Sequence, residues 1–216
     1  MGADHPKQYL KLMDKTVCEH TLMRLLGIAE IDQIVVSVSP EDSWWSALSL
    51  KNEPRITSVK GGKERCDSVL NGLNALRAKA EDHDWVMVHD VARPCVRVED
   101  IHLLMQQTRS HDCGGILATP VRDTMKRSNA DGEIQKTVDR NGLWHALTPQ
   151  IFRYGRLKQA LTDALAAGQP ITDEASAIEW AGGAPLLVEG HPDNIKITHP
   201  NDLKLALLYL REQHQT

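Results

Sequence analysis

An apolar run leads directly into a polar turn at Trp85-Val86-Met87-Val88-His89-Asp90-Val91-Ala92-Arg93-Pro94. The four apolar residues predict a strand that is buried on both faces of a sheet. Asp90 and Arg93 follow just past the carboxyl end of that strand, where open α/β sheets bind their ligands. A carboxylate beside a guanidinium at this edge suits a metal-bound polyphosphate. Taken alone, the pair is equally well explained as a turn with a surface ion pair.

Working outward from this stretch, the chain alternates between two hydrophobic patterns. Further apolar, β-branched runs predict strands over residues 34–38, 56–59, 116–118 and 186–188. Three-to-four spacing predicts helices over residues 16–26, 64–79, 99–108, 155–167 and 172–181, and another that opens at Pro200. This alternation predicts a doubly wound α/β sandwich with a mostly parallel sheet. We expect one domain over residues 1–216.

Residues 120–148 break the alternation. Two polar–apolar runs, 121–126 and 134–138, flank a loop that contains Asp131-Gly132, which is the pattern of a β-hairpin. Because two strands alone are only marginally stable in water, such a polar ribbon either forms its own unit or reaches a second subunit. We favour the second interpretation and expect an arm that mediates a homodimer.

The composition excludes several classes of protein. With 216 residues, 41% hydrophobic and 25% charged, the chain is long enough for one sizeable core. A net charge of −4 without a basic block argues against nucleic-acid binding. No apolar run approaches the roughly 18 residues of a membrane span, and the N-terminus does not have the layout of a signal peptide. We therefore expect a cytoplasmic protein. Its four cysteines form no CxxC pair, and a chain of this size does not need disulfides, so we expect reduced thiols.

Three other motifs carry chemistry, each with a plainer explanation. Gly61-Gly62 precedes a predicted helix that includes Ser68, so its amides are free to face an anion, or it is only a turn. The run from Asp193 to Lys196 offers a carboxylate and an amine on opposite faces of an extended segment, or a solvated surface strand. Thr172-Asp173-Glu174 is typical of a helix N-cap followed by first-turn acids.

Taken in order, these motifs make the sequence similar to the 2-C-methyl-D-erythritol 4-phosphate cytidylyltransferase family over essentially the whole chain. The motifs that carry the resemblance are Pro6-Lys7-Gln8-Tyr9, Gly61-Gly62 with Glu64-Arg65 and Asp67-Ser68-Val69, His89-Asp90 with Ala92-Arg93-Pro94, Pro120-Val121-Arg122-Asp123-Thr124, Asp139-Arg140-Asn141-Gly142-Leu143-Trp144 with Thr148-Pro149-Gln150, Ile171-Thr172-Asp173-Glu174-Ala175, and Asp193-Asn194-Ile195-Lys196.

The resemblance implies a Rossmann-like nucleotidyltransferase homodimer whose arm contributes to the neighbouring active site. It implies catalytic roles for Lys7, Lys196 and Asp90, with Mg²⁺ held by Asp90 and Asp193. The nucleotide contacts implied are Lys7, Gly62, Ser68 and Asp90. The contacts implied for methylerythritol phosphate are Ala92, Arg93, Thr148, Thr172 and Lys196, together with Thr124 and Arg140 from the partner's arm.

The family's pattern opens with a strand and a glycine-rich loop that carries a catalytic arginine, whereas this sequence begins at the far end of that loop. Without that segment the sheet lacks its central first strand, and we expect the sequence to be part of a longer chain.

The implied reaction moves CMP from CTP to 2-C-methyl-D-erythritol 4-phosphate, and it yields 4-diphosphocytidyl-2-C-methyl-D-erythritol and pyrophosphate for non-mevalonate isoprenoid synthesis. A phosphate monoester, with a second pKa near about 6, is already largely dianionic at neutral pH and needs no general base. Two alternatives stay open: a cytidylyltransferase for another polyol phosphate such as ribitol 5-phosphate, and a non-catalytic nucleotide-binding module.

Overall fold

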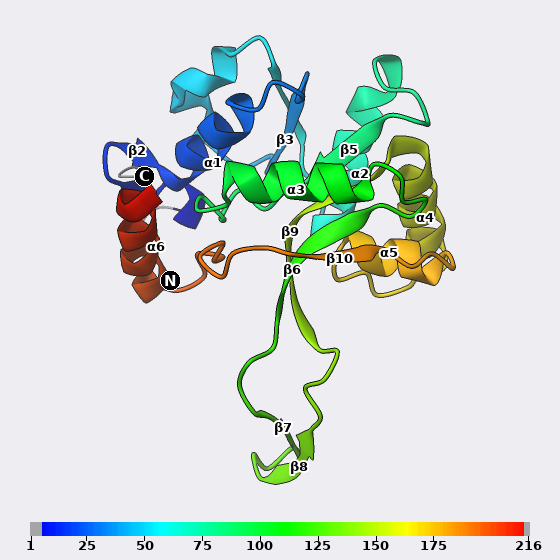
Figure 1. Cartoon of the computed structure of the whole chain (residues 1–216). Helices are drawn as coiled ribbons and strands as arrows, with labels where there is room; N and C mark the ends of the chain where they lie inside the picture. The colour runs from blue at the N-terminus through cyan, green and yellow to red at the C-terminus, as the bar shows by residue number, and fades with distance from the viewer. Residues whose placement is uncertain (1–5, 214–216) are drawn as a thin grey trace.

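The computed structural model describes residues 6–213, and strands alternate with helices through most of this range (Figure 1). A short 3-10 helix, η1, covers Lys7–Tyr9. The α-helices are α1 (Val17–Leu26), α2 (Arg65–Ala75), α3 (Val98–Thr108), α4 (Tyr154–Ala166), α5 (Glu174–Trp180) and α6 (Pro200–Gln213). The strands are β1 (Lys11–Leu12), β2 (Lys15–Thr16), β3 (Ile34–Val38), β4 (Ile56–Lys60), β5 (Trp85–Val88), β6 (Gly115–Pro120), β7 (Met125–Ser128), β8 (Ile134–Val138), β9 (Trp144–Arg153) and β10 (Leu186–Glu189). The predicted α/β sandwich is confirmed.

The main sheet has the strand order β10-β6-β9-β5, and β3 and β4 form a separate parallel pair. β10 runs parallel to β6, but β9 runs antiparallel to both of its neighbours. The sequence pattern predicts no strand at β9, since Pro149 stands in its middle and proline is rare in central strands. β9 is antiparallel because the chain leaves β6 through the arm and returns directly beside it.

Apolar side chains bury the main sheet on both faces. On β6, Leu117 joins a cluster with Ile101 and Leu104 of α3, whereas the adjacent Ile116 joins a cluster on the opposite face with Leu157 of α4 and Ile178 of α5. Successive residues of a strand point to opposite faces, so one strand serves both clusters. This two-sided burial explains the continuous hydrophobicity of the predicted strands.

The arm extends away from this body, with β7 and β8 at its far end (Figure 1). The ladder between β7 and β8 confirms the predicted hairpin, although the first strand covers Met125–Ser128 instead of residues 121–126. All four residues of β7 are exposed, and Ile134 of β8 is 68% exposed. Within the described chain, the ladder of β7 is with β8 alone, so the arm has little packing of its own.

The described residues, 6–213, also bear on membrane spans and on the cysteines. None of the helices there is long and apolar enough to cross a membrane. The four cysteines are free thiols, as expected, and three of them are buried.

Candidate active site

The Asp90 carboxylate lies just past the carboxyl end of β5 and faces three cationic side chains. Its Oδ1 is 3.2 Å from Nε of Arg65, the first residue of α2. Its Oδ2 is 3.0 Å from Nζ of Lys196 and 3.4 Å from Nε of Arg93. The fold thus brings Lys196 to Asp90 and Arg93, which were predicted from a different motif, and adds Arg65. We call these four residues, with Glu174 described next, the Asp90 cluster.

The charges of the Asp90 cluster do not cancel. The Glu174 carboxylate, which is fully buried, accepts hydrogen bonds of 2.6 Å and 2.9 Å from the two Nη atoms of Arg65. Three cations and two carboxylates leave a net charge of +1. Burial acts to raise the pKa of Asp90, but the charges of Arg65 and Lys196 outweigh it and lower that pKa to about 2. The site therefore combines an ionised carboxylate with a surplus of positive charge, which favours a polyanion.

A bulge in β9 places Thr148 against the Asp90 turn. Ile116 pairs with Gln150 and Ala118 with Ala146, so residues 147–149 of β9 oppose a single residue of β6. Such bulges re-aim side chains beside active sites. The Oγ1 of Thr148 accepts a 3.0 Å hydrogen bond from the backbone amide of Asp90. Thr148, predicted as a substrate contact, is therefore also part of the frame that holds Asp90.

His89 completes this frame as a neutral imidazole. Desolvation lowers the pKa of His89 to about 4. Its Nε2 is 3.1 Å from the carbonyl oxygen of Arg93, which can only accept, so Nε2 carries the proton. Nδ1 therefore accepts from the Thr148 hydroxyl at 2.9 Å. The single hydroxyl proton of Thr148 is committed to His89, and the turn from His89 to Arg93 is closed.

The segment that carries Lys196 is tied to the same turn. Arg93 Nη1 donates to the carbonyl oxygen of Asn194 at 2.8 Å, and Asn194 Nδ2 donates to the carbonyl oxygen of Thr148 at 2.8 Å. The amide of Ile197 donates to the carbonyl of Ala92, which is buried. Lys196 thus reaches Asp90 from an extended segment that is anchored on both sides.

The donor chemistry at this edge fits a magnesium ion held by one carboxylate. Mg²⁺ is usually bound through one or two carboxylates and completes its octahedron with water and phosphate oxygens. Asp193, the second predicted ligand, has other partners: its Oδ2 accepts from Arg97 Nε at 2.8 Å and from Gln213 Nε2 at 3.0 Å. Its Oδ1 is buried and has no hydrogen-bond partner among the described residues, so Asp193 stays a predicted ligand through that atom. Between residues 6 and 213 no group of three or more His, Cys, Asp and Glu side chains is arranged to hold a metal.

The glycine turn before α2 forms a closed loop. The amide of Gly62 donates to Ser68 Oγ at 2.9 Å, and Ser68 Oγ donates to the carbonyl oxygen of Glu64 at 3.1 Å. A Cβ at Gly62 would lie 2.2 Å from the Cβ of Asp67, so only glycine fits there. Two of the four predicted nucleotide contacts, Gly62 and Ser68, thus lie together at the start of α2. The expectation that the glycine amides are free is wrong, because Gly62 donates to Ser68 and Gly61 donates to the carbonyl oxygen of Val38.

The start of α5 corrects one expectation and supplies a residue that pattern analysis undervalues. The N-cap is Asp173, whose Oδ1 accepts from the amide of Ser176, and not Thr172, which is exposed. Glu174, predicted as a first-turn acid, is a buried partner of Arg65. One signal in the sequence could have indicated its burial: Glu174 stands four residues before Ile178, which is buried, and the two therefore share a helix face.

Three predicted site residues form no hydrogen bond or ion pair with the Asp90 cluster within the described chain. Lys7 is part of η1, which packs on α1, and it forms no ion pair within the described chain. Thr124 and Arg140 belong to the arm and are exposed, and Arg140 Nη1 donates to the carbonyl oxygen of Arg122 across the arm. The fold of one chain therefore does not bring the arm residues to its own cluster.

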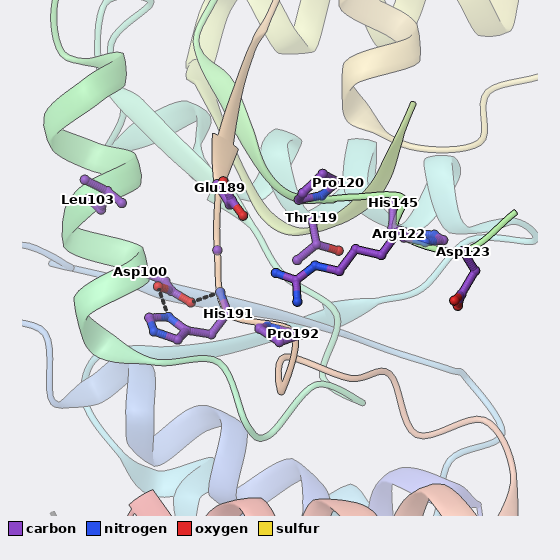
Figure 2. A pocket seen from close by; sticks show the side chains of 11 residues that line it. Asp100, Leu103, Thr119, Pro120, Arg122, Asp123, His145, Glu189, His191 and Pro192 are labelled. Atoms are coloured by element: carbon purple, nitrogen blue, oxygen red, sulfur yellow. Dashed lines mark hydrogen bonds and ion pairs between the residues drawn. The ribbon is translucent and has the colours of Figure 1, made fainter. Parts of the chain in front are cut away.

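A separate pocket of about 480 Å³ opens between α3, the end of β10 and the base of the arm (Figure 2). Asp100 holds His191 there, with 2.7 Å between Oδ1 and Nδ1 of the imidazole. Figure 2 shows Arg122 directed toward Thr119 and His191. The pocket is lined by Asp100, Leu103, Thr119, Pro120, Arg122, Asp123, His145, Glu189, Gly190, His191 and Pro192. None of the predicted site residues is among them.

A doubly wound sandwich that gathers cations around one carboxylate at its carboxyl edge has the architecture of the Rossmann-like nucleotidyltransferases, and solved structures confirm this class. A crystal structure of a 4-diphosphocytidyl-2C-methyl-D-erythritol synthase is 41% identical, with a TM-score of 0.86 and coverage of 95% of both chains. The 2-C-methyl-D-erythritol 4-phosphate cytidylyltransferase of Francisella tularensis is 38% identical, with a TM-score of 0.85 and coverage of 95% of this chain and 94% of that one.

The sequence comparisons give the particular family. The family model described as 2-C-methyl-D-erythritol 4-phosphate cytidylyltransferase (IspD) matches residues 1–212. Proteins of that name from Vibrio vulnificus (strain CMCP6) and Shewanella amazonensis are each 56% identical, over 99% and 100% of this chain and 90% of their own length. The chain belongs to the 2-C-methyl-D-erythritol 4-phosphate cytidylyltransferase family, in agreement with the resemblance seen in the sequence.

Proposed function

We propose that the Asp90 cluster transfers CMP from CTP to 2-C-methyl-D-erythritol 4-phosphate in the non-mevalonate route to isoprenoids. The observation that carries this proposal is the approach of Arg65, Arg93 and Lys196 to one carboxylate at the carboxyl edge of the sheet. Two polyanions must meet in this reaction, and fixed cations offset their repulsion. Family membership supplies the identity of both substrates.

The nucleotide side of the site consists of the glycine turn and the cluster itself. The family resemblance assigns Gly62 and Ser68 to the cytosine, and their loop lies at the N-terminal end of α2 next to Arg65. Lys7 and Lys196 would bind the triphosphate. Lys196 is already 3.0 Å from Asp90.

Asp90 would hold the magnesium ion, with water and phosphate oxygens completing the shell. When bound, the ion neutralises charge on the phosphates of CTP. We assign it first to Asp90, which is ionised and lies beside Lys196 at the carboxyl edge of the sheet. The Oδ2 atom of Asp193 is already paired with Arg97 and Gln213, so Asp193 would contribute only its Oδ1.

The methylerythritol phosphate would lie against Ala92, Arg93, Thr148 and Thr172. In the reaction, an oxygen of its phosphate attacks the α-phosphorus of CTP, a new P–O bond forms, and the bond to pyrophosphate breaks. The attacking phosphate is largely dianionic at neutral pH and needs no general base. The protein's contribution is charge neutralisation by Arg93 and Lys196 and alignment of the two substrates.

The arm supports a homodimer in which each chain completes the other's site. Thr124 and Arg140 lie on the arm, which extends away from its own body (Figure 1). A two-stranded ribbon is marginal in water unless something packs against it. A second copy would cover the exposed Ile134 and receive Thr124 and Arg140. We place this dimer in the cytoplasm.

The proposed function is tested by pyrophosphate release from CTP in the presence of Mg²⁺ and an acceptor. Turnover with methylerythritol phosphate, and none with ribitol 5-phosphate, is the expected result. Preference for ribitol 5-phosphate would reassign the acceptor. CTP binding without turnover, in a chain that also carries the family's glycine-rich loop, would instead indicate a nucleotide-binding module.

A further inference from the structure

We propose that Glu174 is a positioning residue: it holds the Arg65 guanidinium against Asp90 and so fixes the carboxylate that faces the nucleotide. The inference rests on the proposed function, because that function places Asp90 at the nucleotide. It gives a role to a buried acid that contacts neither substrate in the scheme above.

Arg65 binds Glu174 with the two Nη atoms of its guanidinium and Asp90 with its Nε–H. Its two Nη atoms donate to the two oxygens of Glu174 at 2.6 Å and 2.9 Å. The guanidinium is planar, so a bidentate partner on the Nη edge fixes the direction of the Nε–H bond. That bond points to Asp90 Oδ1, with 3.2 Å between nitrogen and oxygen. Glu174 therefore determines where Arg65 meets Asp90.

Glu174 is itself held firmly. Its side chain is 1% exposed, and Gln150 of β9 clamps the residues on either side of it. Gln150 Oε1 accepts from the amide of Ala175 at 2.9 Å, and Gln150 Nε2 donates to Asp173 Oδ2 at 2.9 Å. Gln150 pairs with Val88 of β5, two residues before Asp90. The ion-pair series from Glu174 through Arg65 to Asp90 is thus anchored at both ends by neighbouring strands of one sheet, β9 and β5.

Stability alone is a weak reason for such an arrangement. A buried ion pair seldom stabilises a fold more than apolar side chains of the same volume do. Here the Arg65 side chain is also 35% exposed, and its Nε–H is directed at the Asp90 carboxylate. A purely structural pair would join α5 to α2 without any effect on Asp90, and this difference is measurable.

The main test is Glu174→Gln, with Glu179→Gln as its matched control on the exposed face of the same helix. Removing a partner that orients a metal ligand typically costs about 10–100-fold in activity or metal affinity. We expect kcat, and the affinity of the CTP complex for Mn²⁺ measured by electron paramagnetic resonance, to fall by about this factor. Glu179→Gln should match the wild type. Equal values for both variants would overturn the proposal.

A double-mutant cycle asks whether Glu174 acts through Arg65. If it does, adding Glu174→Gln to Arg65→Ala should change kcat by less than about twofold, because residues of one network are not additive. A full additional loss in the double variant would contradict the proposed route through Arg65.

A third readout separates this inference from the proposed function. The Arg65 Nε–H resonance should exchange slowly with water in the wild type and rapidly in Glu174→Gln, whether or not the chain releases pyrophosphate. Glu174→Asp keeps the charge and replaces Glu174→Gln if the latter does not fold. Unchanged exchange in a folded variant overturns the positioning role. A wild type without turnover counts against the proposed function only.

Discussion

The Asp90 cluster and the arm both follow the carboxyl ends of strands in one sheet, but they depend on opposite kinds of contact. The cluster draws its side chains from α2, the turn after β5, α5 and the segment before α6. The arm is a local ribbon whose ladder joins β7 only to β8 in the described chain. The cluster therefore needs the whole fold of one chain, whereas the arm has only local pairing and exposed strands.

The largest effect should come from the cluster. We expect Lys196→Ala to lower turnover by roughly 10²–10³-fold, as removal of a preorganised donor to transition-state charge does. Lys204→Ala, an exposed lysine on α6, is the control and should retain wild-type turnover. Steady-state kinetics measure both. A loss below about tenfold would contradict the role of Lys196.

The next effect tests whether the arm acts on the other chain. Arg140→Ala and Asp90→Ala should each be inactive. If Arg140 acts across a dimer, mixing the two variants under subunit exchange should restore about a quarter of the wild-type sites, since half of the dimers are mixed and each holds one intact site. Pyrophosphate release measures the recovery.

The control for this mixing experiment uses two variants of the body, Asp90→Ala and Lys196→Ala. No dimer formed from them has an intact site, so this mixture should stay inactive. Failure of the Arg140→Ala mixture to recover would mean that the arm serves its own chain or no site.

We expect the smallest effect, a change in stability, from alanine substitutions at two glycines with positive φ. Gly114 (φ +71°) lies in the body, where a Cβ would be 2.1 Å from the carbonyl oxygen of Ile151. Gly132 (φ +83°) lies at the tip of the arm, where a Cβ would meet nothing within 4 Å. Gly114→Ala should lower the free energy of unfolding by about 2–5 kcal/mol, the sum of backbone strain and overpacking.

Gly132→Ala should carry only the backbone cost of roughly 1–2 kcal/mol, confined to the pairing of β7 with β8. Denaturant unfolding of the body measures both variants. Equal destabilisation by the two would show that arm and body unfold as one unit, against the contrast drawn above.

Much of the fold was predictable because its signals are local. The helix that opens near Thr16 is confirmed, with Thr16 as its N-cap, since capping depends on adjacent residues. The hairpin was predictable from its alternation and Gly132. β9 was not, because Pro149 breaks its strand pattern and only the neighbouring β5 and β6 give it a place. The predicted N-cap of α5, Thr172, was wrong by one residue: the N-cap is Asp173, whose carboxylate accepts hydrogen bonds from Ser176 and Gln150.

The sequence by itself determined the alternation of strands and helices, the arm, the family and the residues of its motifs, because periodicity and motif spacing are properties of short segments. Only the tertiary structure decided which charges meet. It joined Arg65 to both Asp90 and Glu174, and it paired Asp193 with Arg97. Ion pairs between distant segments depend on how strands are ordered in the sheet and on a bulge such as that at Thr148, and neither is encoded in the spacing of nearby residues.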